Sequence, residues 1–175
     1  MLFRSDVAGV TRDRVTHLIE EGDRFFELVD TGGVGINDVD DLDAEIENQI
    51  AIALDAADVL LFVVDTRAGL LPLDEEVAKR LRYIDKTIIC VANKTDDSSF
   101  DTQAYEFYKL GRGKLIRVSA AQNRNRQELM NMIIERLPSP AASDAAEAKE
   151  PTMKVAIVGR RNTGKSTFVD RKSVV

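Results

Sequence analysis

Four residues, Asn93-Lys94-Thr95-Asp96, follow directly after an apolar run and carry the side chains that a guanine-reading site needs. An ionised aspartate only accepts hydrogen bonds, so Asp96 can take both hydrogens that guanine offers from its ring N–H and its exocyclic amine. Adenine presents an acceptor in place of that ring N–H, and a site built on such pairing can reject the wrong base by roughly four orders of magnitude. We expect Asn93 to tie this loop to its neighbours and the stem of Lys94 to cover one face of the base. The same residue types also occur in ordinary turns, so the motif needs partners elsewhere in the chain.

The second chemical motif comes near the end of the sequence, directly after the apolar residues 153–158. It fits the pattern G-x-x-x-x-G-K-S between a strand and a helix, in which glycines let backbone N–H groups wrap phosphates closely. Lys165 would supply a point charge to the outer phosphates and Ser166 an oxygen to Mg²⁺, and the helix that starts near Lys165 adds its positive end. Without a ligand, these residues would form only a glycine-rich turn. The motif consists of Gly159, Arg160, Arg161, Asn162, Thr163, Gly164, Lys165, Ser166 and Thr167.

Two shorter stretches could add groups for the phosphates and the metal ion. Asp30-Thr31-Gly32-Gly33 follows a predicted strand, so Asp30 can hold Mg²⁺ through water and Gly33 can offer a backbone N–H to the terminal phosphate. Thr11 lies in a polar segment and is a candidate second metal oxygen, on a loop that closes only when the third phosphate is present. Each stretch on its own is also what a simple turn contains.

Strands and helices alternate along the chain, which predicts an α/β fold with a mostly parallel sheet and helices on both faces. Each motif falls at the carboxyl end of a strand, where ligands bind in open α/β sheets. This includes Ser119 and Ala120, whose backbone N–H groups would face the guanine oxygen. The predicted strands are residues 15–20, 24–30, 59–64, 87–92, 115–118 and 153–158, and the predicted helices are residues 44–57, 73–84, 101–110 and 127–137.

Composition excludes several classes of function. Of the 175 residues, 44% are hydrophobic, which is enough for a core, and the formal net charge of −6 gives no overall basic field that would attract DNA. No apolar run approaches the length of a membrane span and no signal peptide opens the sequence, so we expect a cytoplasmic protein without a membrane partner. The single cysteine, Cys90, lies in an apolar run and is expected to be a buried thiol.

Taken together, these motifs resemble a translation-factor-class GTPase domain. More narrowly, residues 8–14, 30–34 and 65–70 resemble the Der (EngA) family, and the resemblance covers roughly residues 6–168. It implies a P-loop GTPase fold, GTP and GDP as ligands, Mg²⁺ as cofactor, and hydrolysis of GTP as a switch in assembly of the large ribosomal subunit, which would be the partner. Members of this family carry two GTPase domains in tandem, followed by a KH-like RNA-binding domain.

The same resemblance implies the roles of the site residues. Thr11, Gly33 and Lys165 would take part in hydrolysis, and Ser166, Thr11 and Asp30 would surround the metal ion. The implied nucleotide contacts are Asp30, Thr31, Gly32, Gly33, Val34, Asn93, Lys94, Thr95, Asp96, Ser119, Ala120, Gly159, Arg160, Arg161, Asn162, Thr163, Gly164, Lys165, Ser166 and Thr167.

Two positions bear on how hydrolysis would proceed. Val34 stands where Ras-like proteins place a water-orienting Gln, so the Gln mechanism is not available to this sequence. Asn162 matches a P-loop Asn that is associated with K⁺ acting as a cationic stand-in for an arginine finger. Asn162, however, belongs to the loop of the second domain.

The sequence also departs from the family pattern. Residues 6–137 are interpreted as a first GTPase domain that lacks its own P-loop strand, residues 138–152 as an acidic flexible linker, and residues 153–169 as the start of a second GTPase domain. The ends, residues 1–5 and 170–175, do not match the family and are expected not to be native. The chain is therefore expected to be the middle of a longer protein.

Three interpretations stay open. The first is a fragment of a Der-type enzyme that hydrolyses GTP. The second is a self-contained, circularly permuted GTPase, because each nucleotide motif occurs once and in rotated order. Residues 153–158 would then fill the vacant central strand position and bring Lys165 close to Asp30 and Asn93. The third is a non-catalytic interaction module that binds a partner but, as an isolated fragment, no nucleotide.

Overall fold

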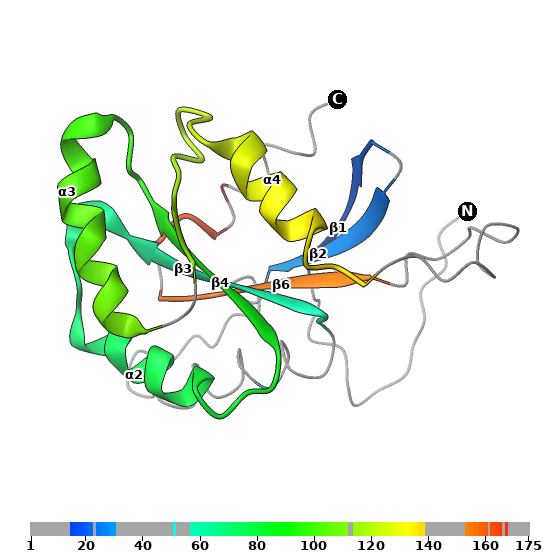
Figure 1. The fold of residues 1–175 in the computed structure, drawn as a ribbon, viewed down its shortest axis with the longest axis horizontal. Helices are drawn as coiled ribbons and strands as arrows, with labels where there is room; N and C mark the ends of the chain where they lie inside the picture. Colours follow the sequence, from blue (N-terminus) through cyan, green and yellow to red (C-terminus); the bar gives the residue numbers. More distant parts are fainter. Residues whose placement is uncertain are drawn as a thin grey trace, which may run out of the picture.

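A sheet of six strands runs through the part of the chain that the structure describes (Figure 1). This computed structural model describes residues 15–22, 24–30, 51, 57–111, 114–138, 153–160, 162–165 and 167. The strand order is β1-β2-β6-β3-β4-β5. Only β1 and β2 pair antiparallel and the other neighbours are parallel, which confirms the predicted α/β fold. The strands are β1 (Val15–Glu21), β2 (Arg24–Asp30), β3 (Val59–Asp65), β4 (Thr87–Asn93), β5 (Leu115–Arg117) and β6 (Lys154–Val158).

β6 pairs with β2 on one side and with β3 on the other. In this register Ala156 lies opposite both Val29 and Leu60. The four residues from Val155 to Val158 are at most 1% exposed, as expected for a parallel strand covered on both faces. The central position that the sequence left vacant is therefore filled by residues that follow the predicted linker. A gap there would leave two rows of backbone N–H and C=O groups unpaired inside the sheet.

Pro138, the first residue of the predicted linker, and Met153, the residue that follows it, both contact Arg24 at the start of β2. Its Nη2 donates to Pro138 O at 2.8 Å and lies 3.8 Å from Met153 Sδ. At the next residue, the N–H of Lys154 donates to the carboxylate of Asp58 at 2.8 Å. These contacts set the point at which β6 enters the sheet.

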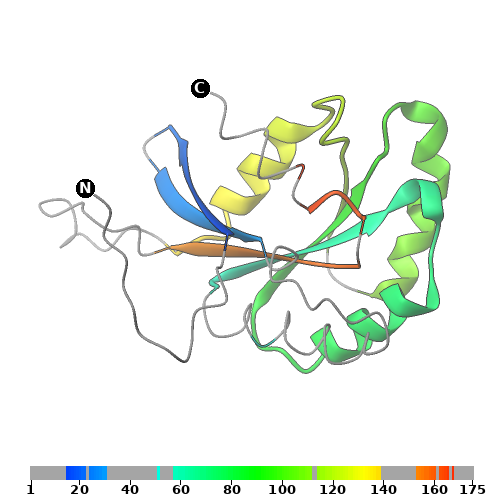
Figure 2. The same ribbon diagram turned by 180° about the vertical axis from the view of Figure 1, so that it is seen from behind.

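Helices cover both faces of the sheet, as predicted. In Figure 1 and, from behind, Figure 2, α4 lies on one side of the strands and α2 and α3 lie toward the other. The helices are α2 (Pro72–Leu81), α3 (Asp101–Ala104), α4 (Arg126–Ile134) and the 3₁₀ helices η2 (Thr66–Ala68), η3 (Ser98–Phe100) and η4 (Tyr105–Leu110).

Three α-helices end earlier than the sequence predicted. After Leu81, Arg82 and Tyr83 are exposed, Tyr83 to 91%, so the two residues directly after the helix add no buried apolar contact. Beyond Ala104 the chain continues as the tighter helix η4, which Gly111 closes in the left-handed conformation at φ 63°. The predicted helices 73–84, 101–110 and 127–137 end as α-helices at Leu81, Ala104 and Ile134.

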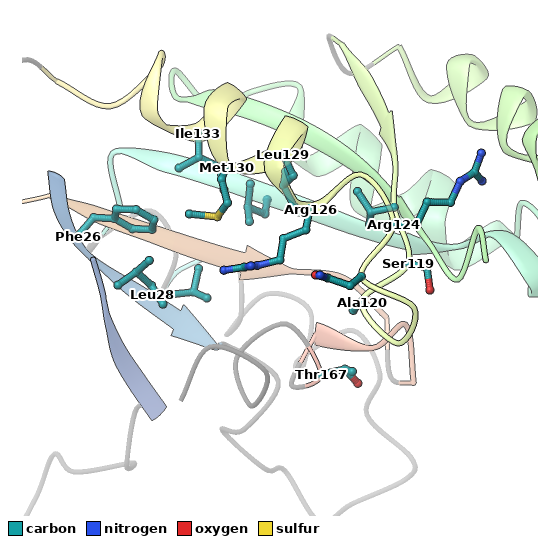
Figure 3. Close-up of a pocket in the computed structure, with 14 residues that line it drawn as sticks. Phe26, Leu28, Ser119, Ala120, Arg124, Arg126, Leu129, Met130, Ile133 and Thr167 are labelled. Carbon is teal, nitrogen blue, oxygen red and sulfur yellow. The ribbon is translucent and has the colours of Figure 1, made fainter. Parts of the chain in front are cut away.

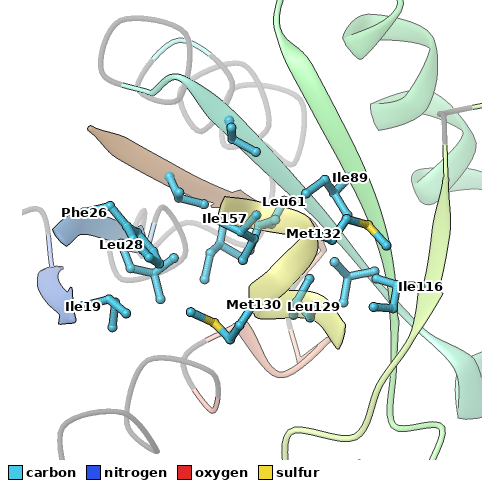
Figure 4. Close-up of a cluster of buried hydrophobic side chains, with 14 of the residues drawn as sticks. Ile19, Phe26, Leu28, Leu61, Ile89, Ile116, Leu129, Met130, Met132 and Ile157 are labelled. Carbon is cyan, nitrogen blue, oxygen red and sulfur yellow. The ribbon is translucent and has the colours of Figure 1, made fainter. Parts of the chain in front are cut away.

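Two apolar clusters join the helices to the sheet. One lies under α2 and η4 and includes Phe62 and Phe107. The other lies under α4 and includes Ile157 of β6 and Leu129 of α4 (Figure 4). Cys90 belongs to the first cluster, which confirms the predicted buried thiol. Burial raises the pKa of this thiol to about 12.

Gly159 is required where β6 runs past β3. Its φ is +147°, and a Cβ at this position would lie 2.2 Å from the backbone oxygen of Val63. A side chain would therefore push the end of β6 away from β3, and with it the loop that follows.

Several predicted features lie outside the described residues. They include residues 1–14, most of the predicted helix 44–57, residues 139–152 and the end of the chain from residue 168. The division into two domains and a linker therefore stays a prediction. Among the helices that the structure describes, none combines the length and the apolar character needed to cross a membrane.

Ile157→Ala tests the central placement of β6. The Ile157 side chain is 0% exposed, so its truncation leaves a cavity and should lower the free energy of unfolding by about 2–5 kcal/mol in urea titrations. The matched control is Leu18→Ala on β1, where the side chain is 61% exposed and the change should stay within about 0.5 kcal/mol. Equally small losses in the two variants would contradict the placement.

Candidate nucleotide-binding site

The predicted site residues lie at one edge of the sheet, where the parallel strands end. In the ladders Asp65 is opposite Asn93, and Asp30 is opposite Ile157 of β6. Asp30 and Asn93 are each 2% exposed, and Lys165, in the loop after β6, is 5% exposed. Polar groups from separate stretches of sequence thus converge where open α/β sheets bind ligands.

Asn93 joins the two main motifs. Its Nδ2 donates to Thr163 O in the glycine-rich loop at 2.7 Å, and its Oδ1 accepts the N–H of Ala120 at 3.1 Å. This confirms the expectation that Asn93 ties its loop to neighbouring loops. Since the side chain is buried, both bonds are shielded from water and either orphaned partner would be costly.

Gly164 lets the glycine-rich loop approach Asn93. Its φ is +89°, and a Cβ built there would lie 2.4 Å from Asn93 Nδ2. Any side chain would therefore displace the amide that holds Thr163. The sequence predicted a glycine at this position so that the loop can wrap phosphates. The structure shows that the glycine is also needed for the contact with Asn93.

Lys165 is held by carbonyl groups of its own loop. Its Nζ donates to Gly159 O at 2.7 Å and to Arg160 O at 2.8 Å. Thr163 Oγ1 also donates to Arg160 O, at 2.9 Å. The ammonium group is therefore kept at the turn between β6 and the following helical residues. A buried cation in a glycine-rich loop suits an anionic ligand.

Arg160 of the same loop faces Asp74 in the first turn of α2. Its Nε lies 3.5 Å from Asp74 Oδ1, and Asp74 Oδ2 accepts the N–H of Leu71 at 3.2 Å. Asp74 is 0% exposed, and burial raises the pKa of its carboxyl, opposed by the Leu71 N–H and the Arg160 charge. The sequence predicted Arg160 as a nucleotide contact; in the structure its guanidinium group faces α2.

Asp96, the predicted guanine reader, has both carboxylate oxygens engaged. Ser119 Oγ donates to Oδ1 at 2.5 Å, and Arg67 forms an ion pair with Oδ2. Neither partner was assigned this role from the sequence. The sequence feature that could have identified Arg67 is its position two residues after Asp65. Asp65 ends β3, which lies next to β4, the strand that carries the Asn93 loop.

Lys94 lies in the left-handed conformation, with φ 62°, and its Nζ is 2.6 Å from Asp65 Oδ2. The other oxygen of Asp65 accepts the N–H groups of Arg67 and Ala68 at 3.0 and 3.3 Å, which caps η2. Sequence analysis did not predict this role of Asp65. One carboxylate thus holds both the ammonium group of Lys94 and the backbone of Arg67.

Arg124 braces the loop that carries Asp96. Its Nη1 donates to Thr95 O at 3.0 Å and to Asp97 O at 2.8 Å. The guanidinium group also binds Asp101 through two hydrogen bonds, of 2.9 and 3.0 Å, and these lower the pKa of that carboxyl. A bidentate pair of this kind fixes direction as well as distance.

The loop after β5 was predicted to offer backbone N–H groups to guanine. Within the protein, the N–H of Ser119 donates to Arg124 O and the N–H of Ala120 donates to Asn93 Oδ1, both at 3.1 Å. Gln122 N–H donates to Ser119 Oγ at 3.0 Å. The loop is thus ordered beside Asp96 by its own hydrogen bonds.

The remaining predicted site residues lie outside the described part of the chain. Of the three predicted metal ligands, only Asp30 is described, and its carboxylate is a hard oxygen donor that suits Mg²⁺. In the described ranges, no group of three or more His, Cys, Asp or Glu side chains could hold a metal ion. The undescribed site residues are Thr11, Thr31, Gly32, Gly33, Val34, Arg161 and Ser166.

A cavity of about 260 Å³ opens beside this site, under α4 (Figure 3). Its wall is mainly aliphatic and aromatic, with Phe26 and Leu28 from β2 facing Met130 and Ile133 from α4. Ser119, Ala120 and Thr167 border it, but Asn93, Asp96 and Lys165 do not. Arg124 and Arg126 also line the cavity, but because Asn93, Asp96 and Lys165 lie outside it, we place the candidate site at the sheet edge.

Comparison with known proteins gives a consistent picture. Residues 3–94 match the model of a family described as 50S ribosome-binding GTPase. A relative named GTPase Der from Rhodopirellula baltica is 55% identical over 162 residues, which cover 93% of this chain and 35% of that protein. A GTPase Der from Moorella thermoacetica is 45% identical over 166 residues, which cover 95% of this chain and 37% of that protein. The chain thus spans about a third of the length of these curated relatives.

A solved structure shares the fold. Translation elongation factor SelB from Methanococcus maripaludis, crystallised with the GTP analogue GPPNHP, superposes with a TM-score of 0.55 at 23% identity. The match covers 72% of this chain and 28% of that protein. At this identity the likeness shows the architecture alone.

Asn93→Ala tests the link between the two motifs. It leaves Thr163 O and the Ala120 N–H without their partner, so the free energy of unfolding should fall by about 2–4 kcal/mol. Amide hydrogen exchange of Gly164 and Lys165 should become faster in the same variant. The control Asn131→Ala, an exposed residue of α4, should change neither quantity appreciably. Unchanged exchange in the glycine-rich loop of Asn93→Ala would contradict the link.

Proposed function

We propose, because this chain belongs to the 50S ribosome-binding GTPase family and is a homologue of GTPase Der, that its sheet edge binds GDP and GTP. Asp96 would read the guanine edge, and the loop that carries Lys165 would hold the phosphates. The observation that carries this proposal is the hydrogen bond from Asn93 to Thr163 O, which holds the base-reading loop against the phosphate loop. A nucleotide needs both loops at once, and the bond sets them side by side.

The other roles follow the sequence motifs. Gly33 would offer its backbone N–H to the terminal phosphate, and Asp30, Thr11 and Ser166 would hold Mg²⁺, which supplies positive charge at the phosphates when bound. Lys165 would exchange the carbonyl groups of Gly159 and Arg160 for phosphate oxygens. Because the ammonium group stays paired throughout, this exchange avoids the free-energy cost of an unpaired buried charge.

The relatives are about three times as long as this chain. Hydrolysis of GTP and binding to the large ribosomal subunit or its precursor are therefore proposals for the whole protein. Val34 in place of a Gln leaves the attacking water to be oriented by other groups. We infer that Asn162, with φ 62°, marks the place for a K⁺ ion in such an arrangement.

A second candidate is favoured by the position of β6. Since β6 completes the sheet in cis, the chain as it stands would bind nucleotide by itself, as a circularly permuted GTPase would. This candidate shares its ligand with the first and differs in needing no other segment of a longer protein. If the titration below detects no nucleotide binding, the third interpretation, a non-catalytic interaction module, would apply to this chain.

Titration of the 175-residue chain with fluorescent GDP and ADP tests the proposal. GDP should bind and ADP should not, and Asp96→Asn and Lys165→Ala should each weaken GDP binding by about 10- to 100-fold, because each removes a charged hydrogen-bonding partner. Lys79→Ala, which alters a lysine 63% exposed on α2, is the control and should bind as the unchanged chain does. Absence of GDP binding by a chain whose circular dichroism shows it to be folded would refute the proposal.

A further inference from the structure

Arg67 covers the carboxylate of Asp96. Its Nη2 is paired with Asp96 Oδ2, while Ser119 Oγ occupies Oδ1. The side chain of Asp96 is 14% exposed and that of Arg67 is 58% exposed. The carboxylate thus lies below the surface and its cation lies on it, where it can be exchanged without disturbing the core.

The chemistry of the two groups makes Arg67 a match for the predicted ligand. A guanidinium group presents N–H donors on a planar N–C–N unit, and so does the edge of guanine that carries the ring N–H and the exocyclic amine. Both are complementary to one carboxylate in its plane. If guanine and Arg67 met at Oδ2 of Asp96, their N–H hydrogens would be brought against each other, which disfavours simultaneous binding.

The backbone of Arg67 is fixed and its side chain has a second partner. The N–H of Arg67 is bonded to Asp65 Oδ1 at 3.0 Å, so the residue stays in η2 whatever its side chain does. Its guanidinium carbon also lies 5.7 Å from the centre of the Phe100 ring, within the range of a cation–π contact. The guanidinium can therefore leave Asp96 and stay against Phe100.

We propose that Arg67 occupies the place of guanine on Asp96 when no nucleotide is bound and is displaced when the base binds. The proposal rests on the proposed function, since it assigns Asp96 to guanine. Arg67 lowers the affinity for guanine nucleotides by the strength of its ion pair. It also keeps Asp96 paired until guanine replaces it, and a base that needs only one carboxylate oxygen competes less with Arg67.

The exposure of the pair sets the size of the effect. Ion pairs with one exposed partner are weak and are screened by salt. Removal of Arg67 should therefore tighten GDP binding by about two- to fivefold, mainly through faster association. The difference between the two proteins should shrink as the salt concentration rises. IDP lacks the exocyclic amine and needs only one carboxylate oxygen, so it should gain less than GDP.

The experiment is stopped-flow binding of fluorescent GDP and IDP to the 175-residue chain and to Arg67→Ala, at low and at high salt. Arg80→Ala is the control, because Arg80 forms an arginine–carboxylate ion pair with Glu76 on α2, 3.2 Å apart, that involves neither Arg67 nor Asp96. Arg67→Lys retains the charge but not the planar donor unit, and it should fall between the unchanged chain and Arg67→Ala. Urea unfolding of each variant reports whether stability has changed.

The outcomes are distinct. Faster and tighter GDP binding by Arg67→Ala at low salt, with a smaller gain for IDP and no change in Arg80→Ala, supports the proposal. Weaker or unchanged GDP binding would overturn it, because Arg67 would then assist the base or play no part. An equal gain for GDP and IDP would overturn competition at Oδ2. If the unchanged chain binds no GDP, the proposed function itself fails.

Discussion

The pairing of β6 with both β2 and β3 is the constraint on which the rest of the structure depends. Two parallel ladders converge on this strand, and its residues alternate between the two apolar clusters, Ala156 and Val158 in one and Val155 and Ile157 in the other. Buried backbone groups must find partners, so the two flanking strands need a strand between them. Gly159 then releases the chain at the sheet edge, where the loop with Lys165 begins.

The candidate site is a set of cations already matched to oxygen atoms of the protein. Lys165 is held by backbone carbonyls, Lys94 by Asp65, and Arg67 by Asp96. Such a site avoids the high cost of unpaired buried charge when no ligand is bound. Ligand binding would then be an exchange of partners, in which the protein loses weak internal pairs and the ligand supplies stronger ones. Arg67 is the most exposed member of the set and the easiest to exchange.

Much of the fold could be predicted because its signals are local. Continuous apolar runs marked the buried strands, and the resemblance of short motifs to the Der family is confirmed by the relatives. The contacts that sequence analysis missed join residues far apart in the chain, such as Arg67 with Asp96 and Asp74 with Arg160. No periodicity or spacing encodes such pairs, since they exist only once the strands have been placed. Helix ends were also missed: after Ala104 the chain tightens into η4 although Phe107 and Leu110 stay buried, a change that the spacing of apolar residues does not encode.

Hydrogen exchange of the β6 amides, read by NMR together with cross-strand contacts, tests the central claim most directly. The account predicts slow exchange from Val155 to Val158 and contacts from Ala156 to both Val29 and Leu60. These contacts should appear within single molecules, which mixing labelled and unlabelled chains can establish. Fast exchange of these amides, or direct pairing of β2 with β3, would contradict it.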